Sequence, residues 1–101
     1  MSREVVVLSA VRSAIGTFGG SLANMEPHEL AGTVMKESIA RSGVDPQQIT
    51  YVTVGNCIPT DSRFAYVARV ASIQAGLAMD SVAMAVNRLC ASGLQGVVTT
   101  A

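Results

Sequence analysis

The chain has 101 residues, of which half are hydrophobic and 14% are charged, and its seven basic and seven acidic side chains leave no formal net charge. This length allows one domain at most, and so apolar a composition excludes a disordered tail. The scattered basic residues exclude a nucleic-acid footprint, and the few charges leave much surface that we expect other protein to cover.

The first predicted element is a strand at residues 5–11, where β-branched and aliphatic side chains follow one another without regular polar alternation. Such a run is typical of a strand that is buried on both faces of a parallel sheet. Gly16, Gly19 and Gly20 then mark a loop. Their spacing matches neither of the common phosphate-binding patterns, so a tight loop is favoured over a phosphate site.

A helix is predicted to begin at Pro27, run to about Ser42 and end at Gly43, because proline suits the first helical position and glycine the position after the last turn. His28, the single histidine, lies in the first turn beside acidic neighbours. A general base is conceivable there, but an exposed start of a surface helix is the favoured interpretation. One face of the helix is small or apolar: Ala31, Val34, Met35, Ser38, Ile39 and Ser42.

A second strand is predicted within residues 49–58 and a second helix over residues 63–75. Asp61 or Ser62 can cap that helix. Arg69 lies close to the apolar stripe of the helix, and the sequence leaves open whether it faces solvent or pairs across a subunit contact. The stripe consists of Phe64, Val67, Ala68, Ala71 and Ala75.

The third strand is predicted at residues 82–86 and the third helix from Ala91 onward. Strands and helices therefore alternate along the whole chain. This alternation predicts an α/β fold with right-handed crossovers and a parallel or mixed sheet that is covered on both faces.

Cys90 lies between the third strand and the third helix, near the first helical turn. Backbone N–H groups converge at such a place and favour the negative charge of a reactive thiolate. Small neighbours, Ala91, Ser92 and Gly93, leave room for a large acyl donor at the sulfur. The alternative is that Cys90 is buried and inert, as cysteines in apolar stretches often are.

Three motifs resemble the thiolases, the acyl-CoA acyltransferases of the condensing-enzyme superfamily. Residues 86–96, VNRLCASGLQG, are similar to the acyl-enzyme signature of that family. The opening at residues 4–20 and the Val54-Gly55-Asn56 element are similar to two further thiolase motifs in the same order. The resemblance covers essentially the whole chain and is to acetyl-CoA acetyltransferases and short-chain 3-ketothiolases of bacteria.

The resemblance implies the first βαβαβα portion of a five-layer α-β-α-β-α sandwich. Residues 1–101 would be the first part of the N-terminal domain, with the loop domain and the C-terminal domain outside this chain. Cys90 would be the nucleophile that carries the acyl-thioester intermediate, and its backbone N–H would be an oxyanion donor.

The implied reaction joins two acetyl-CoA molecules, or cleaves a 3-ketoacyl-CoA in the reverse direction, as in fatty acid metabolism. Coenzyme A is then a substrate or product, no resident cofactor is expected, and no cluster of metal ligands is seen in the sequence. The resemblance also implies a homodimer or homotetramer. The other catalytic groups of the family lie in its C-terminal half, so we expect the 101-residue chain alone to be inactive.

Cys57 has no role implied by the resemblance and is expected in the core. Neither a secretory signal, a transit peptide nor a membrane span is predicted, so reduced thiols in a bacterial cytoplasm are expected. Two alternatives stay open. One is another condensing enzyme, such as a ketoacyl synthase or a synthase of the hydroxymethylglutaryl type. The other is a non-catalytic module that packs against a partner and leaves Cys90 unreactive.

Overall fold

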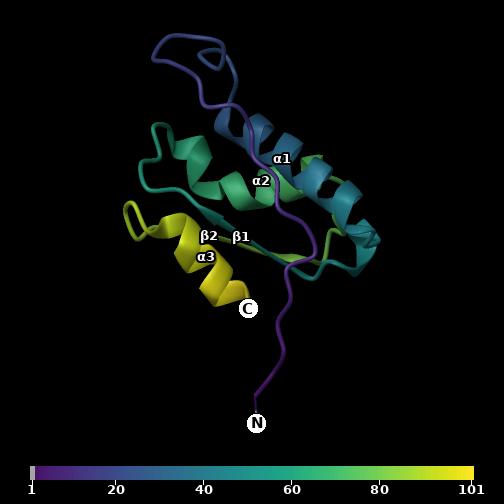
Figure 1. The fold of residues 1–101 in the computed structure, drawn as a ribbon. Coiled ribbons are helices and arrows are strands. Elements are labelled where there is room, and N and C mark those ends of the chain that lie inside the picture. The colour runs from purple at the N-terminus through teal and green to yellow at the C-terminus, as the bar shows by residue number, and fades with distance from the viewer. Residues whose placement is uncertain (1) are drawn as a thin grey trace.

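A computed structural model describes residues 2–101 as an α/β arrangement, which confirms the predicted fold class (Figure 1). None of the helices in this part of the chain combines the length and the apolar character that crossing a membrane would need. The elements in chain order are α1 (Pro27–Ser42), η1 (Pro46–Gln48), β1 (Tyr51–Gly55), η2 (Ser62–Tyr66), α2 (Val67–Gln74), β2 (Val82–Val86) and α3 (Ser92–Thr100), where η denotes a 3₁₀-helix.

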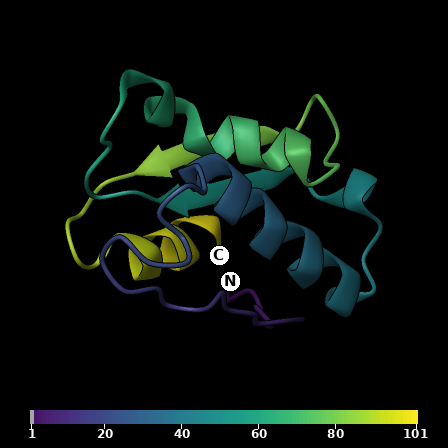
Figure 2. The ribbon, with the colours of Figure 1, turned by 90° about the horizontal axis from the view of Figure 1, so that it is seen from above.

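The two strands pair in parallel, as predicted, with Tyr51 opposite Val82 and Gly55 opposite Val86. The ladder extends one residue further, because the N–H of Asn56 donates to the carbonyl of Val86 at 3.0 Å. α2 covers one face of the strands and α3 covers the other, while α1 packs against α2 (Figure 2). Since parallel strands end at the same edge of a sheet, the residues that follow β1 and β2 come together there.

The predicted first strand is wrong as a sheet element in this structure. Residues 5–11 are extended but do not join the sheet that β1 and β2 form in the described chain (Figure 1). Val7 is 80% exposed, and the segment is instead anchored where the Ser9 hydroxyl donates to the carbonyl of Ser38 at 2.8 Å. β-Branched residues favour an extended backbone, but a strand also needs a neighbouring edge to pair with, and that is decided by tertiary context.

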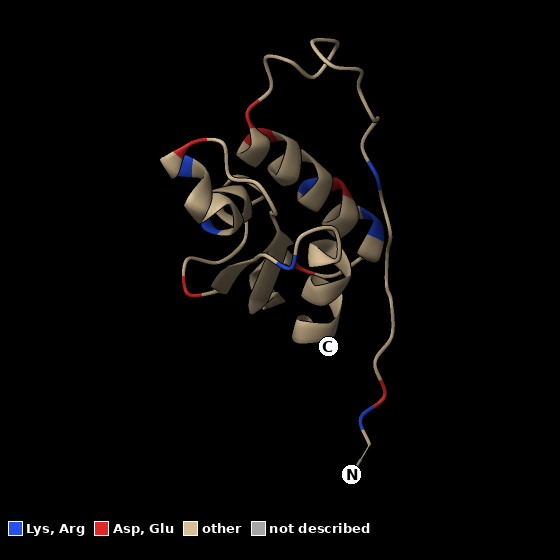
Figure 3. Cartoon of the chain, turned by 90° about the vertical axis from the view of Figure 1, so that its left-hand side faces the viewer, with Lys and Arg blue, Asp and Glu red and all other residues tan. Residues whose placement is uncertain are grey.

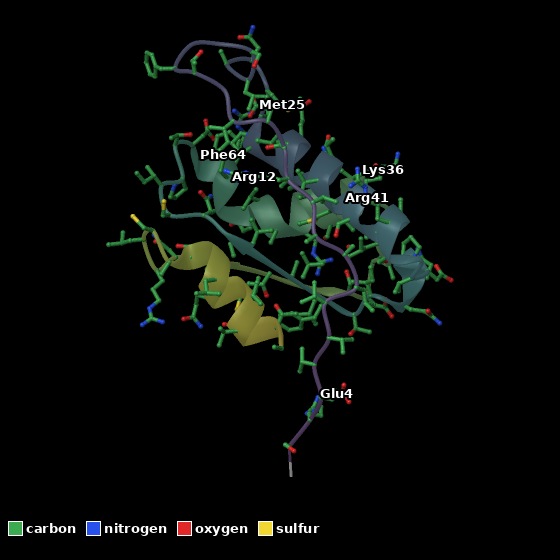
Figure 4. All side chains as sticks on the ribbon, in the orientation of Figure 1. Glu4, Arg12, Met25, Lys36, Arg41 and Phe64 are labelled. Atoms are coloured by element: carbon green, nitrogen blue, oxygen red, sulfur yellow. The ribbon has the colours of Figure 1, made fainter. Side chains whose placement is uncertain are left out.

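The predicted first helix is confirmed as α1. Gly43 ends it with a φ of 73°, a left-handed conformation that glycine adopts without steric cost. Its N-terminus forms a capping box, in which the side chains of Glu26 and Glu29 each accept a backbone N–H. Lys36 and Arg41 lie on the side of α1 away from the body of the molecule (Figure 4), and the small or apolar face is half-buried.

The predicted second helix is divided into η2 and α2, because the backbone at Tyr66 leaves the helical conformation. Asp61 caps its start, since the Asp61 carboxylate accepts the backbone N–H of Arg63 at 2.9 Å. The predicted apolar stripe is confirmed and forms most of the core. The buried hydrophobic residues are Phe64, Val67, Ala68, Ala71, Ala75 and Leu77.

Arg69 does not face open solvent in the described chain, and its pairing across a subunit contact stays a prediction. It is half-buried, and its Nη2 donates to the carbonyl of Ser81, directly before β2. The other terminal nitrogen, Nη1, is buried and has no hydrogen-bond partner in the described chain, so the guanidinium is not turned to water. Arg69 therefore ties α2 to the start of the neighbouring strand.

Candidate functional site

The loop at residues 87–91 carries Cys90 past the end of β2 and two residues before α3 begins, as the sequence predicted. Cys57 follows β1 at the same edge of the sheet. Both cysteines are free thiols and both are exposed. The expectation that Cys57 belongs to the core is wrong, because the chain leaves the sheet after Gly55 and residues 57–63 are all exposed.

Asn87 connects the two strand ends through its side-chain amide. Its Nδ2 donates to the carbonyl of Cys57 at 3.1 Å, and its Oδ1 accepts the backbone N–H of Leu89 at 3.0 Å. Leu89 has a φ of 49° and is the only non-glycine residue with a positive φ among residues 2–101. A β-carbon is disfavoured in this left-handed region, so the surrounding hydrogen bonds must hold the turn in place.

Ser92 holds the same turn from the helix side. Its hydroxyl accepts the N–H of Arg88 at 2.8 Å and donates to the carbonyl of Leu89 at 2.6 Å. The residue is only 4% exposed, so these bonds are shielded from water. The sequence had suggested only that Ser92 is small, and its hydrogen-bonding role was missed because the partners depend on how the loop turns.

Close packing of small residues sets the position of α3 on β1. A β-carbon at Gly55 would lie 2.6 Å from the carbonyl carbon of Ser92, and one at Gly96 would lie 3.3 Å from the side chain of Thr53. The hydroxyls of Thr53 and Thr100 are 2.7 Å apart and hold the other end of the helix. The start of α3, and with it the Cys90 loop, therefore rests directly on the backbone of β1.

The backbone N–H of Cys90 is not used by the turn. Within residues 2–101, the N–H groups that donate in this loop are those of Arg88, Leu89, Ala91 and Ser92. An N–H group beside the thiol is suited to stabilise negative charge on an atom bound to that sulfur. The arrangement provides an exposed thiol, a nearby free donor and the N-terminal end of a helix, which together suit nucleophilic attack on a carbonyl group.

His28 lies elsewhere in the fold and is not part of this loop. Its Nδ1 lies 3.3 Å from Oε1 of Gln74, and its ring leans toward that of Phe64 at a centroid distance of 6.4 Å. The residue is half-buried while its neighbours Pro27 and Glu29 are exposed, so the helix begins at the surface, as expected. No group of three or more potential metal ligands occurs in the described residues.

An open apolar groove of about 580 Å³ lies between the extended N-terminal segment, α1, β1 and α3. The lining includes Val5, Met35, Val52 and Val97 but not Cys90.

Figure 3 shows that α3 carries no charged side chain along its length. Leu94 on this helix is 70% exposed, and Val97 and Val98 are similarly open.

Comparisons with known proteins agree with these motifs. A family model described as "Thiolase, N-terminal domain" matches residues 5–101. The chain is 48% identical over its 101 residues to a beta-ketothiolase of Cupriavidus necator, of which it covers 26%. It is 42% identical over 98 residues to an acetyl-CoA acetyltransferase of the same bacterium, a match that includes 97% of the chain and 25% of the relative.

Two solved structures have the same arrangement. The acetyl-CoA acetyltransferase of Bacillus anthracis matches with a TM-score of 0.88 and 40% identity, over 94% of this chain and 24% of that one. The human mitochondrial 3-ketoacyl-CoA thiolase in complex with CoA matches with a TM-score of 0.89 and 30% identity, over 93% of this chain and 24% of that one. The chain thus spans about a quarter of the length of the relatives that it matches.

Proposed function

The chain belongs to the thiolase family, and from that membership we propose that the whole protein transfers acyl groups between acyl-CoA thioesters. The observation that carries the proposal is the exposed thiol of Cys90, held in the loop that joins β2 to α3. The names of the relatives, beta-ketothiolase and acetyl-CoA acetyltransferase, support the same substrate class.

In the first proposed step, the Cys90 thiolate attacks the carbonyl carbon of an acyl-CoA. The new carbon–sulfur bond forms as the bond to the CoA sulfur breaks, and CoA leaves as a thiolate that takes up a proton. The free N–H of Cys90 would donate a hydrogen bond to the oxyanion of the tetrahedral intermediate. The product is an acyl-cysteine, whose thioester remains reactive.

In the second proposed step, an acetyl-CoA loses a proton from its α-carbon and the resulting carbanion attacks the acyl carbonyl on Cys90. A carbon–carbon bond forms, the bond to the Cys90 sulfur breaks, and acetoacetyl-CoA or a longer 3-ketoacyl-CoA is released. The reverse direction is thiolysis by CoA. This chemistry needs no resident cofactor, and coenzyme A serves only as substrate and product.

Groups for the proton transfers would come from parts of the protein outside these 101 residues. The single histidine of the chain, His28, is engaged with Gln74, which lies on α2 rather than in the Cys90 loop. We accordingly propose that residues 1–101 are the first part of the N-terminal domain of a cytoplasmic homodimer or homotetramer. The loop domain and the C-terminal domain would supply the remaining groups.

The test is to incubate the whole protein with acetyl-CoA and to locate any added acetyl group by mass spectrometry of its peptides. We expect one acetyl group on Cys90, which the Cys90→Ser variant loses and the Cys57→Ser variant keeps. Acetylation that persists in Cys90→Ser, or that resides on Cys57, would contradict the assignment. Formation of acetoacetyl-CoA from acetyl-CoA alone would distinguish a thiolase from the other condensing enzymes.

A second candidate function is a non-catalytic module that packs against a partner, which the open apolar side chains of α3 favour. It predicts that iodoacetamide alkylates Cys90 no faster than Cys57. Rapid and selective alkylation of Cys90 in the whole protein would exclude it.

A further inference from the structure

We infer that Asn87 is a positioning residue, which fixes the direction of the Cys90 thiol by tying its loop to the segment that follows β1. This inference rests on the proposed role of Cys90. It adds a residue that does not touch the reacting atoms and acts through the backbone on either side of it.

The first observation is the local turn. Asn87 Oδ1 accepts the N–H of Leu89 at 3.0 Å, two residues along the chain. An asparagine side chain that bonds the backbone two residues on closes a turn and tolerates an unusual conformation within it. Here the residue in that conformation is Leu89, with a φ of 49°, and Cys90 is the next residue. The direction of the Cys90 side chain therefore depends on a strained turn that Asn87 closes.

The second observation is the bond across the sheet edge. Backbone pairing between the two strands ends where the N–H of Asn56 donates to Val86. One residue later the Asn87 side chain takes over, since its Nδ2 donates to the carbonyl of Cys57 at 3.1 Å, across 30 residues of sequence. A single amide group thus uses its acceptor to close the turn and its donor to attach that turn to the neighbouring chain segment.

The turn does not depend on Asn87 alone for its existence. Ser92 also holds it, through bonds to the N–H of Arg88 and the carbonyl of Leu89, and the N–H of Ser92 donates to the same carbonyl at 3.1 Å. Asn87 itself is exposed, whereas Ser92 is buried. Loss of the Asn87 amide should therefore leave the protein folded while the Cys90 loop moves relative to the strand ends.

The experiment compares three variants of the whole protein. Asn87→Ala removes both bonds, and Asn87→Ser retains a short acceptor for the Leu89 turn while losing the reach to Cys57. Gln47→Ala is the matched control, because Gln47 Nε2 also donates to a carbonyl 29 residues away, that of Gly76 at 3.1 Å, far along the chain from the Cys90 loop. Steady-state kcat and KM for thiolysis of acetoacetyl-CoA are measured, together with the alkylation rates of Cys90 and Cys57 by iodoacetamide.

We expect kcat of Asn87→Ala to fall by about 100-fold while KM changes much less, because a displaced nucleophile loses rate rather than ground-state binding. The kcat of Asn87→Ser should fall by about tenfold, because the bond that closes the Leu89 turn remains while the bond to Cys57 is lost. The Cys90 alkylation rate should change relative to that of Cys57 in both variants. Gln47→Ala should match the wild type in kcat, in KM and in both alkylation rates.

Two results would overturn the inference. One is a kcat and a Cys90 alkylation rate for Asn87→Ala that equal those of the wild type. The other is an equal loss in Asn87→Ala and Gln47→Ala, which would indicate a general effect on stability. Failure of the proposed function is a separate result, seen as the absence of acetyl-Cys90 in the wild type, and the alkylation rates still test the positioning role in that case.

Discussion

At the scale of single residues, the side chains around Cys90 matter for the hydrogen bonds that they make with the backbone. Ser92 is the clearest case, because its buried hydroxyl serves one donor and one acceptor of the turn at once. A methyl group in its place would leave the N–H of Arg88 without an acceptor and would remove one of the hydrogen bonds to the Leu89 carbonyl. The Cys90 loop is therefore held by polar side chains that bond to its own backbone.

We predict that Ser92→Ala lowers the free energy of unfolding by about 1–3 kcal/mol, because the part-buried N–H of Arg88 loses its partner and the Leu89 carbonyl keeps only the N–H of Ser92. It should also slow the alkylation of Cys90 by iodoacetamide. Ser42→Ala is the matched control, since the Ser42 hydroxyl likewise donates to a carbonyl, that of Ile39, and accepts the N–H of Val44. A urea titration and the alkylation rate check both effects, and an equal change of Cys90 reactivity in Ser42→Ala would contradict the local explanation.

Among the elements, the contact between β1 and α3 determines the position of the Cys90 loop. The helix approaches the strand so closely that Gly55 faces the backbone of Ser92, and backbone atoms cannot move aside as a flexible side chain can. The close approach explains why glycine is required at the end of β1, in the Val54-Gly55-Asn56 element that resembles a thiolase motif.

We predict that Gly55→Ala lowers the free energy of unfolding by about 1–3 kcal/mol, because its β-carbon would push α3 away from β1. Gly93→Ala is the control, as its β-carbon would meet nothing within 4 Å, and we expect a change of less than about 1 kcal/mol there. The urea midpoints of unfolding of the two variants and of the wild type check both changes in stability. Equal stability of Gly55→Ala and the wild type would mean that the helix can shift freely on the strand.

The cap of η2 should make the stability of the folded protein depend on pH. The side chain and the backbone N–H of Arg63 bond to the Asp61 carboxylate and hold its pKa below the usual value for aspartate. Since the pKa is lower in the folded state, the stabilisation is present above the unfolded pKa of about 3.9 and is lost as the pH falls through the folded value.

We therefore expect Asp61→Asn, which retains an acceptor for the cap, to be less stable than the wild type at pH 7 and equal to it at low pH. Urea midpoints between neutral pH and about pH 2 check this expectation, because the difference should close only below about pH 4. A difference that persists unchanged into acid would mean that the charge of Asp61 does not contribute.

At the scale of the whole molecule, apolar surface is open on several sides of a small core. Phe64 and its buried neighbours lie between α1, α2 and the strands, whereas the N-terminal segment, the apolar groove and the outer face of α3 carry exposed aliphatic side chains. Exposed apolar area of this extent is typical of a surface that other protein covers. The chain spans about a quarter of its relatives, which agrees with that interpretation.

We predict that residues 1–101 alone cleave no acetoacetyl-CoA at a rate above background and bind the hydrophobic dye ANS. The reason is that the chain offers a thiol but no acid–base partner beside it in the described residues, while its apolar faces stay open. The rate of thiolysis is measured as the decrease in acetoacetyl-CoA absorbance. Turnover comparable to that of an ordinary enzyme would contradict this prediction and would place the whole active site within 101 residues.

The local elements of this protein follow from short stretches of its sequence. Its signals for α1, β2, the Asp61 cap and the loop position of Cys90 are local, since they depend on helix start and stop residues and on short apolar runs, and the structure confirms each of them. Tertiary packing, in contrast, leaves residues 5–11 outside the sheet, exposes Cys57, and brings Asn87 and Ser92 into contact with the turn. Those outcomes depend on partners up to 30 residues away, and which groups meet across such a distance is set by packing rather than by the identity of neighbouring residues.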